Sequence, residues 1–169
     1  MPLDFDALMA SCADDIYAYL VARMGNRFDA DDVFQSTFLR VFRFLPSFRG
    51  AASPATWVMR IAMNEASSFR GRRHELPLLV SEEQLVHPAS DSPPYDPVLA
   101  EEESDVAAGL QHLSPDLRDV LFFYFYKNMS YEDIAALVNK PVGTIKSRLF
   151  RAKAELRALL EEHHDHRQL

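Results

Sequence analysis

The stretch Ser130–Arg157 limits most strongly what this chain can fold into, because its pattern predicts two helices joined by a tight turn. Ser130 followed by Asp133 is typical of a capping box at a helix start. The Asn-Lys-Pro turn at 139–141 interrupts the pattern, since proline cannot continue a helix and asparagine tolerates turn geometry. The sequence therefore predicts one helix that starts at Ser130 and a second that begins near Val142.

The second of these helices is strongly basic. Residues 140–157 carry six basic side chains against one acid, Glu155. Four apolar residues recur at helical spacing and are expected to face inward: Ile145, Leu149, Ala152 and Leu156. The basic residues must then point outward, as in a helix-turn-helix that presents a reading helix to the major groove of DNA. An amphipathic helical hairpin with a solvated basic face is the alternative at this point.

Composition favours a helical protein of a reducing compartment. Phenylalanine is abundant (12) and glycine scarce (5), and no alternating pattern of useful length predicts a strand. Cys12 is the only cysteine, which excludes a disulfide framework and a thiolate metal cluster. We expect its thiol to be buried or inert rather than a redox sensor. The sequence shows neither a membrane-spanning run nor a signal peptide pattern, so we expect a cytoplasmic protein without membrane insertion.

The net charge of −7 is unevenly distributed along the chain. Residues 1–74 carry a net charge of +1, residues 104–169 carry 0, and residues 75–103 carry −8. The acidity therefore belongs to one segment, and the overall charge is a poor guide to the partners of the two ends.

That acidic segment also contains five prolines and shows no sustained helical period. It is typical of a linker between two domains. As a flexible coil its ends would lie roughly 30 Å apart, and fully extended it could reach roughly 100 Å. Two interpretations of this segment remain open. It is either a disordered spacer or an acidic segment that occupies a basic channel on a partner.

We therefore expect an all-α fold of two small helical domains joined by an acidic, Pro-rich linker, with a helix-turn-helix in the C-terminal one. The expected boundaries are residues 1–74, linker 75–103, 104–162 and a flexible tail 163–169. The helices expected before the helix-turn-helix are Phe5–Met24, Asp29–Leu45, Pro54–Phe69, Ser104–Leu113 and Leu117–Tyr126.

Aromatic and basic residues gather in the N-terminal half, where they suggest a surface for unpaired bases. Trp57 is the only tryptophan, and Asn64 follows it by two helical turns, so both can share one face. An amide there could read the edge of an extruded base. A core tryptophan and an exposed, merely polar asparagine are the competing interpretation.

At this point the chain resembles a bacterial RNA polymerase sigma factor of the extracytoplasmic-function class, within the sigma-70 family. The similarity rests on DADDVFQSTFLRVFRFLPSFRG, TWVMRIAMNEASS, LSPDLRDV and SYEDIAALVNKPVGTIKSRLFRAKAEL, in this order. It covers roughly residues 5–73 and 105–160. The resemblance implies a protein that binds core RNA polymerase and directs promoter-specific initiation, reading duplex minus-thirty-five DNA and capturing melted minus-ten DNA.

The resemblance also implies which residues meet each partner. The polymerase would contact Asp31, Asp32, Gln35 and Arg40. The melted minus-ten element would contact Phe48, Arg49, Trp57, Arg60, Asn64, Arg70, Arg72 and Arg73. The minus-thirty-five element would contact Thr144, Lys146, Ser147, Arg148, Phe150 and Arg151. In the family, Asn64 would hold a flipped base and the arginines at 70–73 would grip phosphates.

Two positions depart from the family pattern. Tyr124 stands where relatives often carry a basic contact to phosphate, which removes one expected backbone anchor. Lys146 stands where arginine is also common, and lysine is a weaker bidentate reader. With no further domain evident after the helix-turn-helix, we expect regulation by a separate anti-sigma factor.

Other functions remain as alternatives. A sigma-like decoy would bind polymerase or DNA without initiating, and a simple repressor would use only the helix-turn-helix and leave the helix around Asp31 unexplained. An enzyme is not expected, since the sequence lacks a phosphate loop and a metal-ligand cluster. His163, His164 and His166 are expected to belong to the tail rather than to a metal site. We expect no cofactor and no small-molecule substrate.

Overall fold

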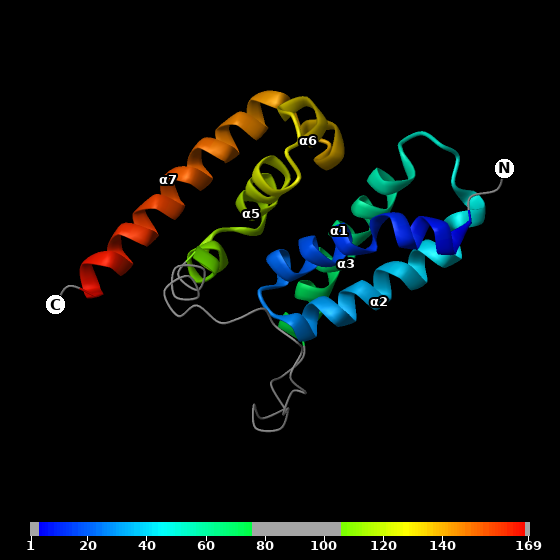
Figure 1. The fold of residues 1–169 in the computed structure, drawn as a ribbon, viewed down its shortest axis with the longest axis horizontal. Helices are drawn as coiled ribbons and strands as arrows, with labels where there is room; N and C mark the ends of the chain where they lie inside the picture. Colours follow the sequence, from blue (N-terminus) through cyan, green and yellow to red (C-terminus); the bar gives the residue numbers. More distant parts are fainter. Residues whose placement is uncertain (1–3, 76–105, 168–169) are drawn as a thin grey trace, which may run out of the picture.

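The computed structural model of the chain describes residues 4–75 and 106–167, and the side chains of 4–69 and 106–162. Every regular element among these residues is a helix (Figure 1). The N-terminal unit consists of α1 (Phe5–Met24), α2 (Arg27–Phe44), the 3-10 turn η1 (Leu45–Ser47) and α3 (Pro54–Glu75). The C-terminal unit consists of a helix at 106–112, α5 (Pro115–Leu121), the π-helical turn η2 (Phe122–Tyr126), α6 (Tyr131–Val138) and α7 (Val142–Arg167).

The caps of the N-terminal unit follow from its sequence. Helix α1 ends at Gly25, whose φ of 81° is the left-handed conformation that glycine adopts without strain. Asn26 then caps α2, because its side chain accepts a hydrogen bond from the Asp29 amide at 2.9 Å. Ser53 caps α3 in the same way, accepting from the Thr56 amide at 3.2 Å. Helix α3 runs beyond Phe69, where we expected it to end.

The three helices of this unit contact one another and share one apolar core. It is built from one face of each helix: Ile16, Tyr19 and Leu20 of α1, Val33, Phe38 and Val41 of α2, and Val58, Ala62 and Ala66 of α3. Cys12 belongs to this core, and burial raises the pKa of its thiol. The expectation of a buried cysteine is thus confirmed.

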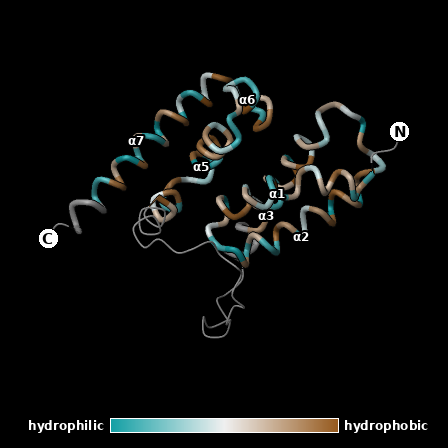
Figure 2. Tube along the Cα trace, viewed as in Figure 1, coloured by the Kyte–Doolittle hydropathy of each residue, from teal (hydrophilic) through white to brown (hydrophobic). Residues whose placement is uncertain are grey.

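The C-terminal unit is packed around α7, which contacts both α5 and α6. In Figure 2, apolar and polar residues alternate along α7, because one side packs inward and the other faces water. The expected inward residues Ile145, Leu149 and Ala152 are buried, and Leu156 is half-buried.

The helix-turn-helix forms as expected. Ser130 Oγ accepts a hydrogen bond from the Asp133 amide at 3.1 Å, which starts α6. Asn139 takes a left-handed φ of 54° and ends it. Helix α7 begins at Val142 and continues to Arg167, into the segment 163–169 that we expected to be a flexible tail. Leucine, alanine and glutamate around 158–162 are strong helix formers, which accounts for the extension.

The segment Leu117–Tyr126 is not the uniform core helix that we expected. It changes at Phe122 into a π-helical turn, where the Lys127 amide donates to the Phe122 carbonyl at 3.1 Å. The wider turn keeps Phe123 buried but leaves Phe125 and Tyr126 60% and 63% exposed. Only one side of this aromatic run therefore packs into the core.

The two units pack directly against each other. Helix α1 contacts α5 and α3 contacts α6, so the C-terminal unit lies along the face formed by α1 and α3 (Figure 1). The Tyr19 ring stacks on Phe123 at a centroid distance of 5.4 Å. The expected linker at 75–103 lies outside the described residues, apart from Glu75 at the end of α3. Among the helices that are described, none is long and apolar enough to cross a membrane.

Candidate nucleic-acid interface

A hollow of about 350 Å³ opens on the N-terminal unit between η1, the loop after it and α3. Four of the residues expected at the minus-ten surface line it: Phe48, Arg49, Trp57 and Arg60. The Phe48 and Trp57 rings lie 5.0 Å apart and tilted by 47°, so they form two adjoining walls. The expectation had not included its other lining residues, Phe44, Ser47, Ala51, Ala52 and Ile61.

The loop that closes this hollow follows from local sequence. Pro46 cannot continue α2, and the chain turns through η1 instead. Gly50 then takes a φ of 73°, which few other residues adopt, and Ser53 starts α3. The reversal lays Phe48 against Trp57.

Trp57 fits both interpretations of the sequence, as a core residue and as part of a surface for unpaired bases. Its ring is half-buried and packs against the core, and it also lines the hollow. Asn64, seven residues further along α3, is exposed and lies outside the lining of the hollow. The side chains of Arg70, Arg72 and Arg73 lie outside the described residues, although α3 continues through their backbone.

The chemistry of this hollow suits an unpaired base. Aromatic walls offer stacking surfaces that every base can use. The exposed Arg49 and Arg60 supply guanidinium groups at the rim, where they can pair with phosphate or base edges. Arg60 is already engaged in this structure, because it donates to the Ala136 and Leu137 carbonyls of α6 at 2.7 and 3.3 Å.

The second candidate surface is the outer face of α7. Among the residues expected to contact DNA, Ser147, Phe150 and Arg151 lie furthest from the buried stripe at 100° per residue, and Phe150 is 76% exposed. Thr144 is half-buried beside them. Ser147, Phe150 and Arg151 are all exposed on this convex face, as a reading helix requires.

Charged residues on both sides of that face are held by neighbours. Arg148 pairs with Asp116 of α5 at 2.6 Å. On the other side, Lys146 Nζ lies 5.6 Å from the centre of the Tyr131 ring, and Lys153 Nζ lies 5.4 Å from that of Tyr124. Such cation–π contacts contribute about 0.5–1 kcal/mol at exposed sites.

The third surface is the outer face of α2. Asp31, Asp32 and Gln35 are exposed there. Asp31 accepts a hydrogen bond from the Tyr17 hydroxyl at 2.8 Å, which raises the pKa of Tyr17. Arg40 forms an ion pair with the buried Glu65 at 3.0 Å while 53% of its own side chain stays exposed.

Two exposed apolar residues on α2 were not among the expected contacts. Leu39 is 72% exposed and Phe42 is 65% exposed. Asp32, Gln35 and Leu39 follow one another by three and four residues, so they share one outward stripe. That spacing, counted from the acidic start of α2, was the signal that could have identified Leu39.

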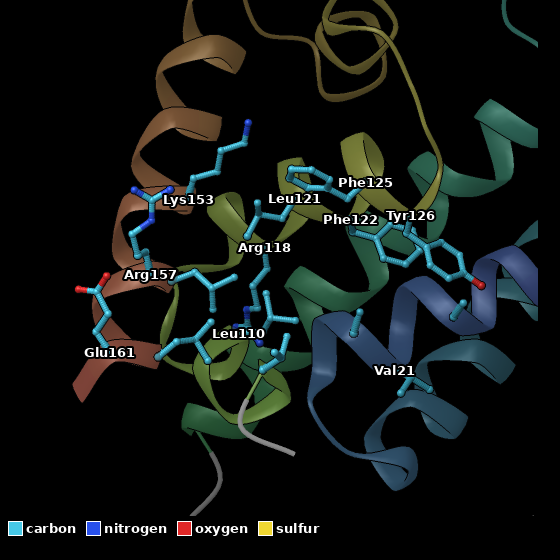
Figure 3. A pocket seen from close by; sticks show the side chains of 15 residues that line it. Val21, Leu110, Arg118, Leu121, Phe122, Phe125, Tyr126, Lys153, Arg157 and Glu161 are labelled. Atoms are coloured by element: carbon cyan, nitrogen blue, oxygen red, sulfur yellow. The ribbon is translucent and has the colours of Figure 1, made fainter. Parts of the chain in front are cut away.

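An apolar groove of about 900 Å³ lies where α1, the 106–112 helix, α5, η2 and α7 meet. Figure 3 shows Leu110 and Leu121 between Val21 of α1 on one side and Lys153, Arg157 and Glu161 of α7 on the other. The groove is a second feature that sequence reasoning missed, because its walls come from both units.

No cluster of three His, Cys, Asp or Glu side chains that could hold a metal occurs within the part of the chain that the structure describes. The side chains of His163, His164 and His166 lie outside that part.

Comparisons with known proteins agree with both units. Residues 8–75 match the family model of sigma-70 region 2, and residues 105–156 match that of sigma-70 region 4. The chain is 34% identical to the RNA polymerase sigma-H factor of Pseudomonas aeruginosa over 166 residues, which cover 93% of this chain and 86% of the relative. It is 32% identical to the ECF RNA polymerase sigma-E factor of Haemophilus influenzae over 155 residues, covering 86% and 82%.

Among solved structures, the chain resembles the sigma factor RpoE of Bartonella quintana in its complex with the anti-sigma factor NepR. The TM-score is 0.71 at 26% identity, and the alignment covers 94% of this chain and 97% of that one. The fold is also similar to that of CnrH in its complex with the cytosolic domain of CnrY, with a TM-score of 0.65.

Proposed function

This chain belongs to the extracytoplasmic-function class of the sigma-70 family, and from that premise we propose which of its surfaces perform each step of promoter recognition. It is a sigma factor that binds core RNA polymerase and directs promoter-specific initiation. The chain itself carries out no chemistry in this proposal, and nucleotide addition is the work of the polymerase. Such a role places it in the cytoplasm, where promoters and polymerase are.

The hollow beside α3 captures the melted minus-ten strand. Phe48 and Trp57 stack against an unpaired base, Arg49 holds backbone phosphate, and Asn64 meets a second extruded base. Arg60 joins them when it is released from α6, and Arg70, Arg72 and Arg73 extend the phosphate track. The observation that carries this proposal is that four residues chosen from the sequence line one hollow.

The outer face of α7 reads the duplex minus-thirty-five element. Ser147, Phe150 and Arg151 face the base edges, with Thr144 beside them. Arg148 and Lys146 lie at the two margins, where phosphates line the groove.

The outer stripe of α2 binds core polymerase. Asp31, Asp32, Gln35 and Arg40 supply polar contacts, and Leu39 and Phe42 supply the apolar surface that a stable helix-to-helix interface needs. Both side chains stay largely exposed, although the Phe42 ring meets the Phe5 ring edge-on at 5.3 Å, and neighbouring exposed apolar side chains support a binding role.

The apolar groove between the units takes a helical segment of an anti-sigma factor. Two solved relatives of the same fold are complexes with an anti-sigma factor or a cytosolic partner domain. A photoreactive residue at Leu110 should crosslink to that partner, and the same residue at exposed Glu132 should not. Inhibition of transcription by the purified partner, relieved by Leu110→Glu, supports the proposal, and inhibition unaffected by that change contradicts it.

The test of the main function adds the purified chain to core polymerase and scores open-complex formation on a pool of random promoters. Selective transcription with two enriched elements is the expected result. Tight polymerase binding without initiation would instead identify a decoy. Binding of duplex DNA with no affinity for core polymerase would identify a simple repressor.

A further inference from the structure

The aromatic residues of η2 and α6 form a ladder with two lysines of α7. The rings of Tyr124 and Tyr131 stack at 5.3 Å with an angle of only 8° between their planes. Lys146 stands over Tyr131, and Lys153 stands over Tyr124 and also over Phe125, 5.2 Å from that ring. Four side chains far apart in the sequence are thus ordered in one row.

The row of side chains runs along one margin of the outer face of α7. Lys146 and Lys153 are seven residues apart, two turns on the same side of α7, which places them about 10 Å apart along its axis. Both are exposed, and both tyrosines are half-buried beneath them. The four-carbon side chain of an unrestrained lysine samples many conformations. A ring face below the ammonium group reduces the number of conformations that it samples.

We propose that the stacked pair Tyr124–Tyr131 is a positioning platform that holds Lys146 and Lys153 ready to bind two phosphates beside the minus-thirty-five element. The proposal rests on the function proposed for α7. It also explains the unusual tyrosine at 124, since the residue supplies no charge of its own but orders the charge of Lys153. Two ordered cations then replace one basic anchor.

The salt dependence of promoter binding separates this role from a purely structural one. Each phosphate contact that is lost lowers the slope of log affinity against log salt by about 1. On the promoter selected by the wild-type holoenzyme, Tyr124→Leu is expected to weaken binding about fivefold and to lower the slope by about 1. Tyr124→Phe retains the ring and is expected to retain both values.

A double variant completes this test. In Lys153→Met the cation is already gone, so adding Tyr124→Leu should cost little more. A weaker complex with an unchanged salt slope, or equal losses in Tyr124→Leu and Tyr124→Phe, would overturn the platform. Failure of wild-type holoenzyme to select any promoter would refute the proposed function instead, which keeps the two outcomes distinct.

A separate observation concerns the junction of the two units, where a buried polar network crosses from α1 to α5. Arg23 Nη1 lies 2.6 Å from Asp119 Oδ2, with both side chains only 7% exposed. The Tyr19 hydroxyl donates to Asp119 Oδ1 at 3.1 Å, and Arg23 Nη2 donates to Ser67 of α3 at 3.3 Å. One carboxylate of the C-terminal unit is therefore held by two side chains of the N-terminal unit.

Further contacts flank this network. Arg118 donates to the Arg23 carbonyl at 3.1 Å. Gln111 lies so close over Gly25 that a Cβ there would stand 2.2 Å from Gln111 Oε1. At the other end, Arg60 donates to the last carbonyls of α6, which are left without intrahelical partners and attract a cation.

This arrangement is incompatible with simultaneous use of both DNA surfaces. Promoter elements two helical turns apart lie about 70 Å apart along the duplex. Here α3, which carries the hollow, and α6, which adjoins the reading helix, are in direct contact. Arg60 is also occupied by α6 instead of DNA.

We infer that the Arg23–Asp119–Tyr19 network is a latch that keeps the free sigma factor closed, and that polymerase must break it. The latch consists only of contacts between the two units and shares no residue with the tyrosine platform. Asp119→Ala removes the carboxylate that faces the Arg23 guanidinium, so the buried cation loses this counter-charge and the variant favours the separated state, where the cation meets water. Replacing both partners by apolar residues removes the cost and restores closure.

The test measures compaction of the full chain by small-angle scattering, without polymerase. Asp119→Ala should enlarge the radius of gyration, Arg23→Leu/Asp119→Leu should return it to the wild-type value, and Glu132→Ala, an exposed acid on α6, should leave it unchanged. Circular dichroism establishes that the helices persist in each variant. An unchanged radius in helical Asp119→Ala would overturn the latch.

The affinity for DNA provides the second readout. If about a tenth of wild-type molecules are open, release should raise the apparent affinity for a single-stranded minus-ten oligonucleotide about tenfold. Expansion without any gain in affinity would overturn the inference that closure hides the site. The scattering result does not depend on promoter recognition, so it stands or falls separately from the proposed function.

Discussion

The two units of this protein present DNA with opposite shapes. The N-terminal unit offers a hollow with aromatic walls, whereas the C-terminal unit offers a convex helix whose charged margins are held by neighbouring side chains. The difference corresponds to the state of the DNA that we propose each unit meets. An unpaired base needs a cavity and a ring to stack on, while a duplex needs a protruding helix that enters its groove.

The largest effect is expected from Arg148→Glu. It places an anion beside Asp116 and opposite phosphate, so both of its contacts become repulsive. Transcription from a promoter that depends on the minus-thirty-five element should fall by about 100-fold, corresponding to about 3 kcal/mol. Asp116→Ala is the control, because it releases Arg148 without altering α7. Unchanged promoter use by Arg148→Glu would remove this margin from the reading surface.

A smaller loss of promoter function is expected from Asn64→Ala, which tests the N-terminal unit. Loss of a base-edge contact of about 1–3 kcal/mol should reduce open-complex formation at least about fivefold and leave polymerase binding intact. Permanganate footprinting of the melted strand measures open-complex formation, and a titration with core polymerase measures polymerase binding. Ser68→Ala, another exposed position one turn further on α3, should change neither. Equal loss of both properties would contradict base capture.

Leu39 and Phe150 sharpen the comparison further, since both are apolar and similarly exposed, at 72% and 76%. Leu39→Ala should weaken polymerase binding about tenfold and leave the melting temperature unchanged, because its side chain packs against little in the free protein. Phe150→Ala should spare polymerase binding and weaken only the minus-thirty-five duplex contact. If both variants lost polymerase affinity equally, the assignment of α2 to the polymerase would fail.

The smallest effect concerns Cys12. Burial raises the pKa of its thiol, so less thiolate is present at any given pH and alkylation is slowed. We expect iodoacetamide to label the folded protein slowly at pH 8 and the urea-unfolded protein fully, as measured by intact mass. Equally fast labelling of both states would show that α1 opens readily around this residue.

Local signals in the sequence were enough for most of the helical framework. Ser53, Ser130, Asn139 and Pro141 act within a few residues of their own position, and each starts or ends a helix where it was expected. The change to π-helical geometry at Phe122 carried no such signal. It accompanies the stacking of the buried Phe123 on Tyr19, a residue more than 100 positions earlier in the chain.

The candidate sites show the same division. The family resemblance named Phe48, Arg49, Trp57 and Arg60, and the structure brings these four together around one hollow, because they lie within a short stretch that folds back on itself. The engagement of Arg60 by α6 and the pairing of Arg23 with Asp119 could not be predicted, since neither pair has any periodic relation in the sequence. Contacts between units are set by the shapes of whole faces, which no window of residues contains.

The polar centre of the junction matters for what happens after the units separate. A junction closed only by leucine and phenylalanine would, once opened, expose an adhesive surface and invite aggregation in a crowded cell. Arg23, Asp119 and Arg118 instead become ordinary hydrated ions when water reaches them. We therefore expect the separated units to aggregate less readily than units released from a wholly apolar junction would.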